Sequence, residues 1–119
     1  MLTIAADSLA LPIPIQIKRS FRDSFERRAY VRAYLLACRL LEEPALVHAG
    51  RAYLDRFIAT DPRQQQIYRM WTYALDQPVE DLIRDLLTDS AAGAALRESA
   101  PVFTVVPASE IRALDRAIS

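Results

Sequence analysis

Glycine occurs only twice in this chain of 119 residues, at Gly50 and Gly93. β-Sandwiches and β-barrels need many tight turns, and glycine adopts the backbone conformations of such turns at little cost. A helical chain needs far fewer of them. Prolines instead punctuate the sequence, and two of them follow residues that can cap a helix, in Thr60-Asp61-Pro62 and Asp76-Gln77-Pro78. The scarcity of glycine and the placement of proline therefore predict an all-α fold.

Apolar residues recur at helical spacing between these breaks. The first helix is expected to follow Ser20 as its N-cap, with Asp23 as capping partner. The length fits a single helical domain over residues 1–119, with an arm at 1–20 and a core at 21–119. We expect a compact antiparallel bundle of about five to six short helices. The expected helices cover residues 21–43, 44–59, 62–75, 78–87, 91–99 and 107–118.

The first 20 residues do not fit a helix. In the segment PIPIQI, Ile13, Ile15 and Ile17 alternate with prolines and a glutamine, which predicts an extended Pro/Ile N-terminal arm with its isoleucines on one side. Two placements remain open at this point. The arm packs over its own domain, or it docks on another chain.

The segment LRESAPVF, residues 96–103, follows a run of helix-forming residues. Pro101 disfavours helical backbone at Ala100, so we expect the helix to stop there. The apolar run at 102–106 is then either a short extended piece or a buried link back to the core.

Cys38 is the only cysteine, so the chain has no internal disulfide, which suits a cytoplasmic protein. No run of 18 apolar residues exists, and the N-terminal residues make a poor secretory signal. We therefore expect a cytoplasmic protein that does not contact a membrane.

Charge is distributed unevenly although the chain is neutral overall. Residues 18–39 contain seven cations and two anions, a net charge of +5, and residues 40–119 have a net charge of −4. A basic segment of this kind can pair within the fold, bind a protein, or bind nucleic acid. Residues 79–98 can be drawn as a helix-turn-helix, but the acidic first helix would repel phosphates.

Interfaces favour tyrosine, tryptophan and arginine together. Tyr68, Arg69 and Trp71 lie within one helical turn, and the arginines of the first helix lie opposite its apolar arc. The candidate partner-binding residues are Ile13, Ile15, Ile17, Arg28, Arg32, Arg39, Tyr68, Arg69 and Trp71.

Catalytic signals are weak. His48 is the only histidine, so a histidine metal site cannot form within one chain. No glycine-rich phosphate loop and no nucleophile elbow occur. We expect no catalytic residue, no metal and no cofactor, and we rank a small enzyme that uses His48 below both binding hypotheses.

Two stretches carry a family resemblance: EEPALVHAGRAYLDRF at 42–57, and the segment from Trp71 through LDQPVEDLIRDLLTDSAAGAALRESAPVF. Together, over about residues 40–118, they resemble small arginine-rich helical bacterial proteins of toxin–antitoxin-like gene pairs. The turn at Pro101 departs from the family pattern, because Ala100 precedes the proline and Val102 separates it from Phe103. The resemblance implies a non-enzymatic antitoxin-like inhibitor or accessory subunit, with the neighbouring-gene toxin or a second copy of itself as partner. A nucleic-acid-binding regulator that uses residues 18–39 is the alternative.

Overall fold

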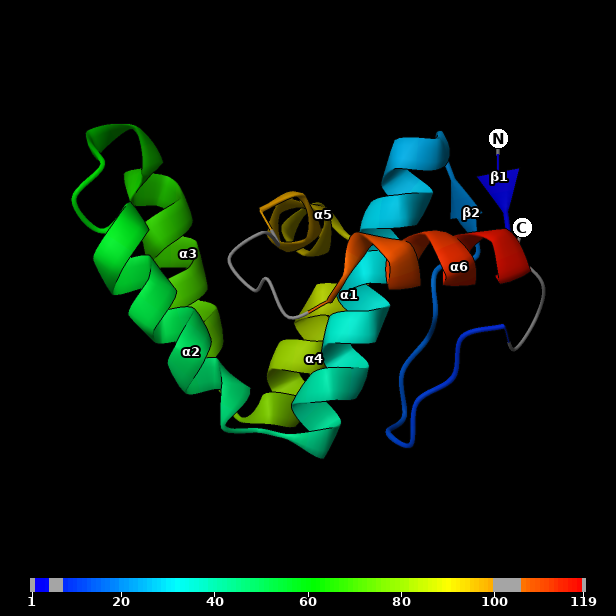
Figure 1. The fold of residues 1–119 in the computed structure, drawn as a ribbon, viewed down its shortest axis with the longest axis horizontal. Helices are drawn as coiled ribbons and strands as arrows, with labels where there is room; N and C mark the ends of the chain where they lie inside the picture. The colour runs from blue at the N-terminus through cyan, green and yellow to red at the C-terminus, as the bar shows by residue number, and fades with distance from the viewer. Residues whose placement is uncertain (1, 5–7, 100–105, 119) are drawn as a thin grey trace.

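The computed structural model describes residues 2–4, 8–99 and 106–118, and it confirms the all-α fold (Figure 1). Six α-helices form a compact globule with a very small two-stranded hairpin. The elements are β1 (Leu2–Thr3), β2 (Ser20–Phe21), α1 (Ser24–Glu42), α2 (Leu46–Tyr53), the π-helical turn η1 (Leu54–Ile58), the 3₁₀ turn η2 (Pro62–Gln64), α3 (Gln65–Asp76), α4 (Val79–Leu87), α5 (Ala91–Glu98) and α6 (Ala108–Ile118).

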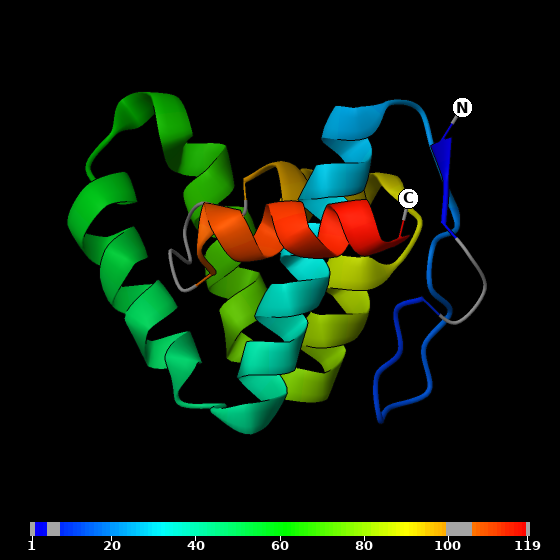
Figure 2. The ribbon, with the colours of Figure 1, turned by 45° about the vertical axis from the view of Figure 1, so that its right-hand side comes forward.

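Helix α1 lies at the centre and packs against α4, α5 and α6 (Figures 1 and 2). The wide apolar arc of the sequence predicts this position, because several helices cover different sides of α1. The start of the helix differs from expectation. Asp23 is the N-cap and accepts a hydrogen bond from the Glu26 amide at 2.9 Å, whereas Ser20 lies in β2. The N-cap is thus Asp23, which directly precedes the helix, and not Ser20.

Helices α2 and α3 form a hairpin that stands to one side of α1 and α4 (Figures 1 and 2). The turn between them follows the expected signal, because Asp61 accepts a hydrogen bond from the Arg63 amide at 2.9 Å just before α3. The second helix ends differently. It continues through η1 as a π-helical turn, which the periodicity of the sequence did not predict.

The remaining helices begin close to their expected positions. Ser90 caps α5 by accepting a hydrogen bond from the Gly93 amide at 3.0 Å, and serine is one of the residues favoured at this position. Asp76 does not cap α4; it forms an ion pair with Arg51 of α2 instead. The fourth helix therefore starts without a side-chain cap.

The N-terminal arm packs on its own domain. Its two ends pair as β1 and β2, with Leu2 opposite Phe21 and Thr3 opposite Ser20. Ile13, Ile15 and Ile17 are partly buried against the core, and the residues between them are exposed. The sequence predicted this alternation, and of the two placements it left open, the structure has the arm on its own chain.

The expected return of the chain after Pro101, including Val102 and Phe103, lies outside the described residues. The chain is described again from Val106, which packs against the core. Helix α6 then crosses α1 with Ile111, Leu114 and Ile118 on its inner side.

Candidate protein-interaction site

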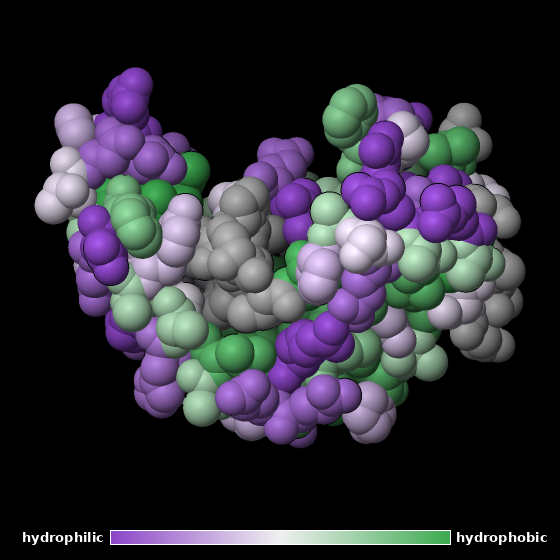
Figure 3. Space-filling model, viewed as in Figure 1, coloured by the Kyte–Doolittle hydropathy of each residue, from purple (hydrophilic) through white to green (hydrophobic). Residues whose placement is uncertain are grey.

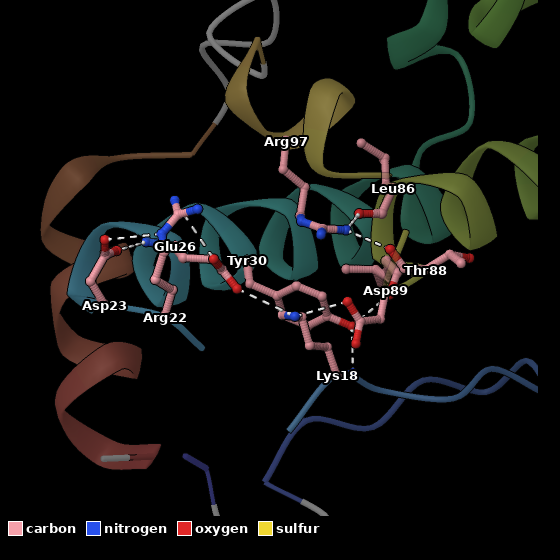
Figure 4. A network of polar contacts seen from close by, with 10 residues as sticks. Lys18, Arg22, Asp23, Glu26, Tyr30, Leu86, Thr88, Asp89 and Arg97 are labelled. Atoms are coloured by element: carbon pink, nitrogen blue, oxygen red, sulfur yellow. Dashed lines mark hydrogen bonds and ion pairs between the residues drawn. The ribbon is translucent and has the colours of Figure 1, made fainter. Parts of the chain in front are cut away.

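Arg97, a buried arginine, is at the centre of a polar cluster where α4 and α5 meet. Arg97 of α5 is only 3% exposed, and its Nη1 donates hydrogen bonds to the carbonyl oxygens of Leu86 at 3.0 Å and Thr88 at 2.9 Å (Figure 4). Its guanidinium lies 5.0 Å from the centre of the Tyr30 ring. The last turn of a helix leaves carbonyls without partners in the helix. Arg97 satisfies two carbonyls where α4 ends, which fixes α5 against α4.

Tyr30 connects this arginine to the arm. Its hydroxyl donates to the Leu87 carbonyl at 2.7 Å and accepts from the Lys18 amide at 3.0 Å. Burial raises the pKa of the Tyr30 phenol above its ordinary value. The Lys18 ammonium in turn lies 2.8 Å from Asp89 and 3.3 Å from Glu26 (Figure 4). The hydrogen bond with Asp89 raises the pKa of Lys18.

Gly93 permits the close contact between α4 and α5. A Cβ atom at this position would lie 2.3 Å from the Thr88 carbonyl oxygen and 2.9 Å from Nη1 of Arg97. Both distances are too short for a carbon atom, and one of the two neighbours is backbone. Gly93, one of the two glycines of the chain, is therefore required for the buried position of Arg97.

Beside this cluster lies an open groove of about 420 Å³ between α1 and α5, which we call the α1–α5 groove. Four cations, three carboxylates and three apolar residues line it. They are Lys18, Arg22, Phe25, Glu26, Ala29, Arg32, Asp89, Ala94, Arg97 and Glu98.

Phe25 stands at the rim of the groove, near the start of α1. It is 78% exposed, the highest value among the large apolar side chains that the structure describes. The Arg28 guanidinium lies 5.3 Å from the centre of its ring, and Arg28 also bonds the Ser24 carbonyl and hydroxyl. Figure 3 shows hydrophobic and hydrophilic surface side by side at this end of α1. An exposed aromatic ring under an arginine is typical of interface anchors.

Arg32 is the cation of the groove that has no partner in the described part of the chain. Its Nε atom is closed off from solvent and has no hydrogen-bond acceptor, and the side chain has no hydrogen bond or ion pair to any residue that the structure describes. A buried N–H group without an acceptor is unfavourable. The side chain lies on the same face of α1 as Phe25, two turns farther along. The groove therefore contains an unsatisfied donor.

Most cations of the basic segment are neutralised by the chain itself. Arg27 pairs with Asp115 at 2.8 Å, and Arg39 pairs with Glu110 at 2.7 Å, so both tie α1 to α6. Lys18 and Arg22 also face carboxylates. Of the three arginines expected to form a partner-binding face, Arg39 is thus occupied, whereas Arg28 and Arg32 have no carboxylate partner in the described part of the chain.

The other predicted contact residues lie away from this groove. Tyr68 donates to Asp55 at 3.0 Å, and Arg69 is exposed on α3. Trp71 is fully buried, and its Nε1 donates to the Ser99 hydroxyl at 2.7 Å, so its ring belongs to the core and offers no surface to a partner. The placement of tryptophan next to arginine in sequence does not show on which side of a helix each one lies.

Most residues of the groove were not selected from the sequence, and Phe25 and Arg97 are the two that matter most to the site. Phe25 has a recognisable signal, because a single aromatic residue between charged neighbours, RDSFERR, is typical of an exposed ring. Arg97 has none of its own, since its burial depends on where α5 packs. The nearby glycine in the alanine-rich stretch AAGAAL indicates only a close approach.

The residue types that often act in catalysis or bind metals do not gather at one place in the described part of the chain. His48 is exposed on α2, and burial raises the pKa of the Cys38 thiol, which disfavours the reactive thiolate. No three metal-ligating side chains come together in the described ranges. Among the same residues, no helix is both long and apolar enough to cross a membrane.

Comparison with known proteins gives no further assignment: no protein-family profile, curated protein or solved structure matches this chain.

Proposed function

We propose that this chain is a non-catalytic interaction protein that binds a partner protein through the N-terminal half of α1 and the adjoining groove. The observation that supports the proposal best is the exposed ring of Phe25 with Arg28 stacked on it, next to the unpaired Arg32. Arginine and aromatic residues contribute most of the binding energy in many interfaces.

The role that the sequence resemblance implies is a narrower form of the same proposal. In this form the partner is the toxin encoded by the neighbouring gene, and the chain neutralises it in the cytoplasm as an antitoxin-like inhibitor or accessory subunit. Coexpression of the two genes tests this role. The chain should restore growth to cells that express the neighbour, and the Phe25→Ala variant should fail to do so.

Binding of nucleic acid by residues 18–39 is the less favoured alternative. Four of the seven cations of this segment already face carboxylates of the same chain. Phosphate binding depends on cations whose counterions are released on contact. Retention on duplex DNA at low salt that is lost in an Arg28→Gln/Arg32→Gln double variant would favour the alternative over protein binding.

Site-specific photocrosslinking tests the proposal directly. A benzoylphenylalanine placed at position 25 should crosslink one protein in cells of the organism that encodes this chain. The same group at position 57 is the matched control, because Phe57 is also exposed and also lies under an arginine, Arg56, at 5.2 Å. The complex should then re-form from purified components. Equal crosslinking at both positions, or none at position 25, would contradict a partner site at the start of α1.

A further inference from the structure

The α1–α5 groove has two features that together define a ligand. One is the unpaired guanidinium of Arg32, and the other is the exposed ring of Phe25. Resting on the proposed function, we infer that the groove binds an acidic segment of the partner protein, with a carboxylate side chain on Arg32 and an apolar side chain against Phe25.

The pairing of the cations in the groove supports a carboxylate, although the four cations and three carboxylates of the lining, Glu98 included, leave a net charge of only +1. Lys18 and Arg22 are balanced by Glu26 and Asp89, so they offer little net attraction to a ligand. Arg97 is engaged with the carbonyls at the end of α4. Of the four cations, Arg32 alone has no acceptor among the residues that the structure describes. Side-on pairing through Nε and one Nη atom is the bidentate geometry that arginine forms with carboxylates, and it would satisfy the closed-off Nε after a small rotation of the side chain.

The shape of the groove supports a segment rather than a single small anion. Phe25 and Arg32 are seven residues apart on one helix, which places them about 10 Å apart along its axis. About three residues of a chain in the polyproline II conformation span that distance, and side chains three positions apart then point to the same side. Ala29 lies between them on the same face of α1, Ala94 of α5 also lines the groove, and both side chains are small enough to leave room for a peptide backbone. The structure thus matches an apolar residue and an acidic residue three positions apart.

A pair of peptides tests the inference. The probe is an acetylated, amidated hexapeptide with leucine and glutamate three positions apart and serine elsewhere; its counterpart has glutamine in place of glutamate. We expect saturable binding of the glutamate peptide in the millimolar range, monitored by the amide resonances of α1 and α5. The glutamine peptide should bind at least about tenfold more weakly, since the charge-assisted hydrogen bonds are lost.

Variants of the protein locate the binding. Arg32→Gln should remove the preference for the glutamate peptide, and Phe25→Ala should weaken both peptides. Arg112→Gln on α6 is the matched control and should change neither, because Arg112 is an exposed arginine outside the groove. No saturable binding, or a preference for glutamate that survives in Arg32→Gln, would overturn the inference.

The identified partner separates this inference from the proposed function. If the partner crosslinks at position 25 but binds Arg32→Gln with unchanged affinity, the proposed function stands, and the inferred contact between a partner carboxylate and Arg32 is wrong. If size measurements instead show a dimer of this chain that Arg32→Gln disrupts, the occupant is a second copy, and the acidic segment of a different protein is rejected. Binding of duplex DNA through the same arginine would reject it as well.

Discussion

Arg97 and Arg32 both line the α1–α5 groove, but only Arg97 has acceptors for its hydrogen-bond donors. Arg97 is buried, bonds two carbonyls and lies over the Tyr30 ring. Arg32 is partly buried, and its Nε lacks an acceptor. The same residue type therefore has two roles a short distance apart. Arg97 is tied to the fold by its hydrogen bonds, whereas Arg32 makes no hydrogen bond or ion pair with the residues that the structure describes.

Substitution of Arg97 should have the largest effect on the fold. Arg97→Met retains most of the volume but removes both hydrogen bonds from a charged donor; the buried Leu86 carbonyl loses this donor, whereas the Thr88 carbonyl keeps its hydrogen bond from the Ser90 amide. We expect the free energy of unfolding to fall by about 2–4 kcal/mol. Urea denaturation followed by circular dichroism measures it. Arg97→Lys, which keeps one cationic donor group, should fall between wild type and Arg97→Met, and an unchanged midpoint in both variants would show that the buried arginine is not structural.

Gly93→Ala should be the next most harmful change, and its sign is informative. Alanine ordinarily stabilises a helix relative to glycine by about 1 kcal/mol. Here the added methyl group would collide with the Thr88 carbonyl and Arg97, so we expect a loss of about 1–3 kcal/mol instead. The same denaturation experiment tests it. A more stable variant would mean that α5 does not pack as closely on α4 as the structure shows.

Tyr30→Phe isolates the link between the arm and the helices. The variant keeps the ring under Arg97 but removes the hydroxyl that bonds the Leu87 carbonyl and the Lys18 amide. We expect a loss of about 1–2 kcal/mol. Faster hydrogen exchange at the Lys18 amide should accompany it, because that amide loses its acceptor; protection equal to wild type would argue against the link.

Alkaline pH should weaken the same cluster. The pKa values of Tyr30 and Lys18 are raised in the folded protein above the ordinary values of 10.0 and 10.5. Folding therefore favours the protonated forms, so this stabilisation is present below about pH 10 and is lost as the pH rises through the folded pKa values. Melting temperatures across this range measure it. Tyr30→Phe should lose less stability than wild type between neutral and alkaline pH, and parallel curves would contradict the assignment.

Arg32→Gln should change stability least. Its side chain makes no hydrogen bond or ion pair within the described part of the chain, so we expect a change within about 0.5 kcal/mol. A slight gain in the free energy of unfolding is consistent with removal of a charged N–H group that has no acceptor. A loss as large as that of Arg97→Met would remove the distinction between the two arginines.

The sequence predicted the helices well because their apolar periodicity and capping residues are local signals. Asp61 and Ser90 cap the helices that follow them, and the isoleucines of the arm face the core. The sequence did not predict the difference between Arg97 and Arg32, because the burial and the hydrogen bonds of each arginine depend on how the helices pack against one another. Trp71 illustrates the same limit, because an aromatic residue beside arginine looks like an interface anchor until the packing of α3 is known.

Rotation of the two guanidinium groups shows most directly whether Arg97 is held by hydrogen bonds and Arg32 is not. Nitrogen NMR of the arginine side chains reports rotation about the Nε–Cζ bond with and without the glutamate peptide. We expect slow rotation of Arg97 in both conditions, and fast rotation of Arg32 that becomes slow only when the peptide binds. Slow rotation of Arg32 in the free protein, or no response to saturating peptide, would contradict an available arginine in the α1–α5 groove.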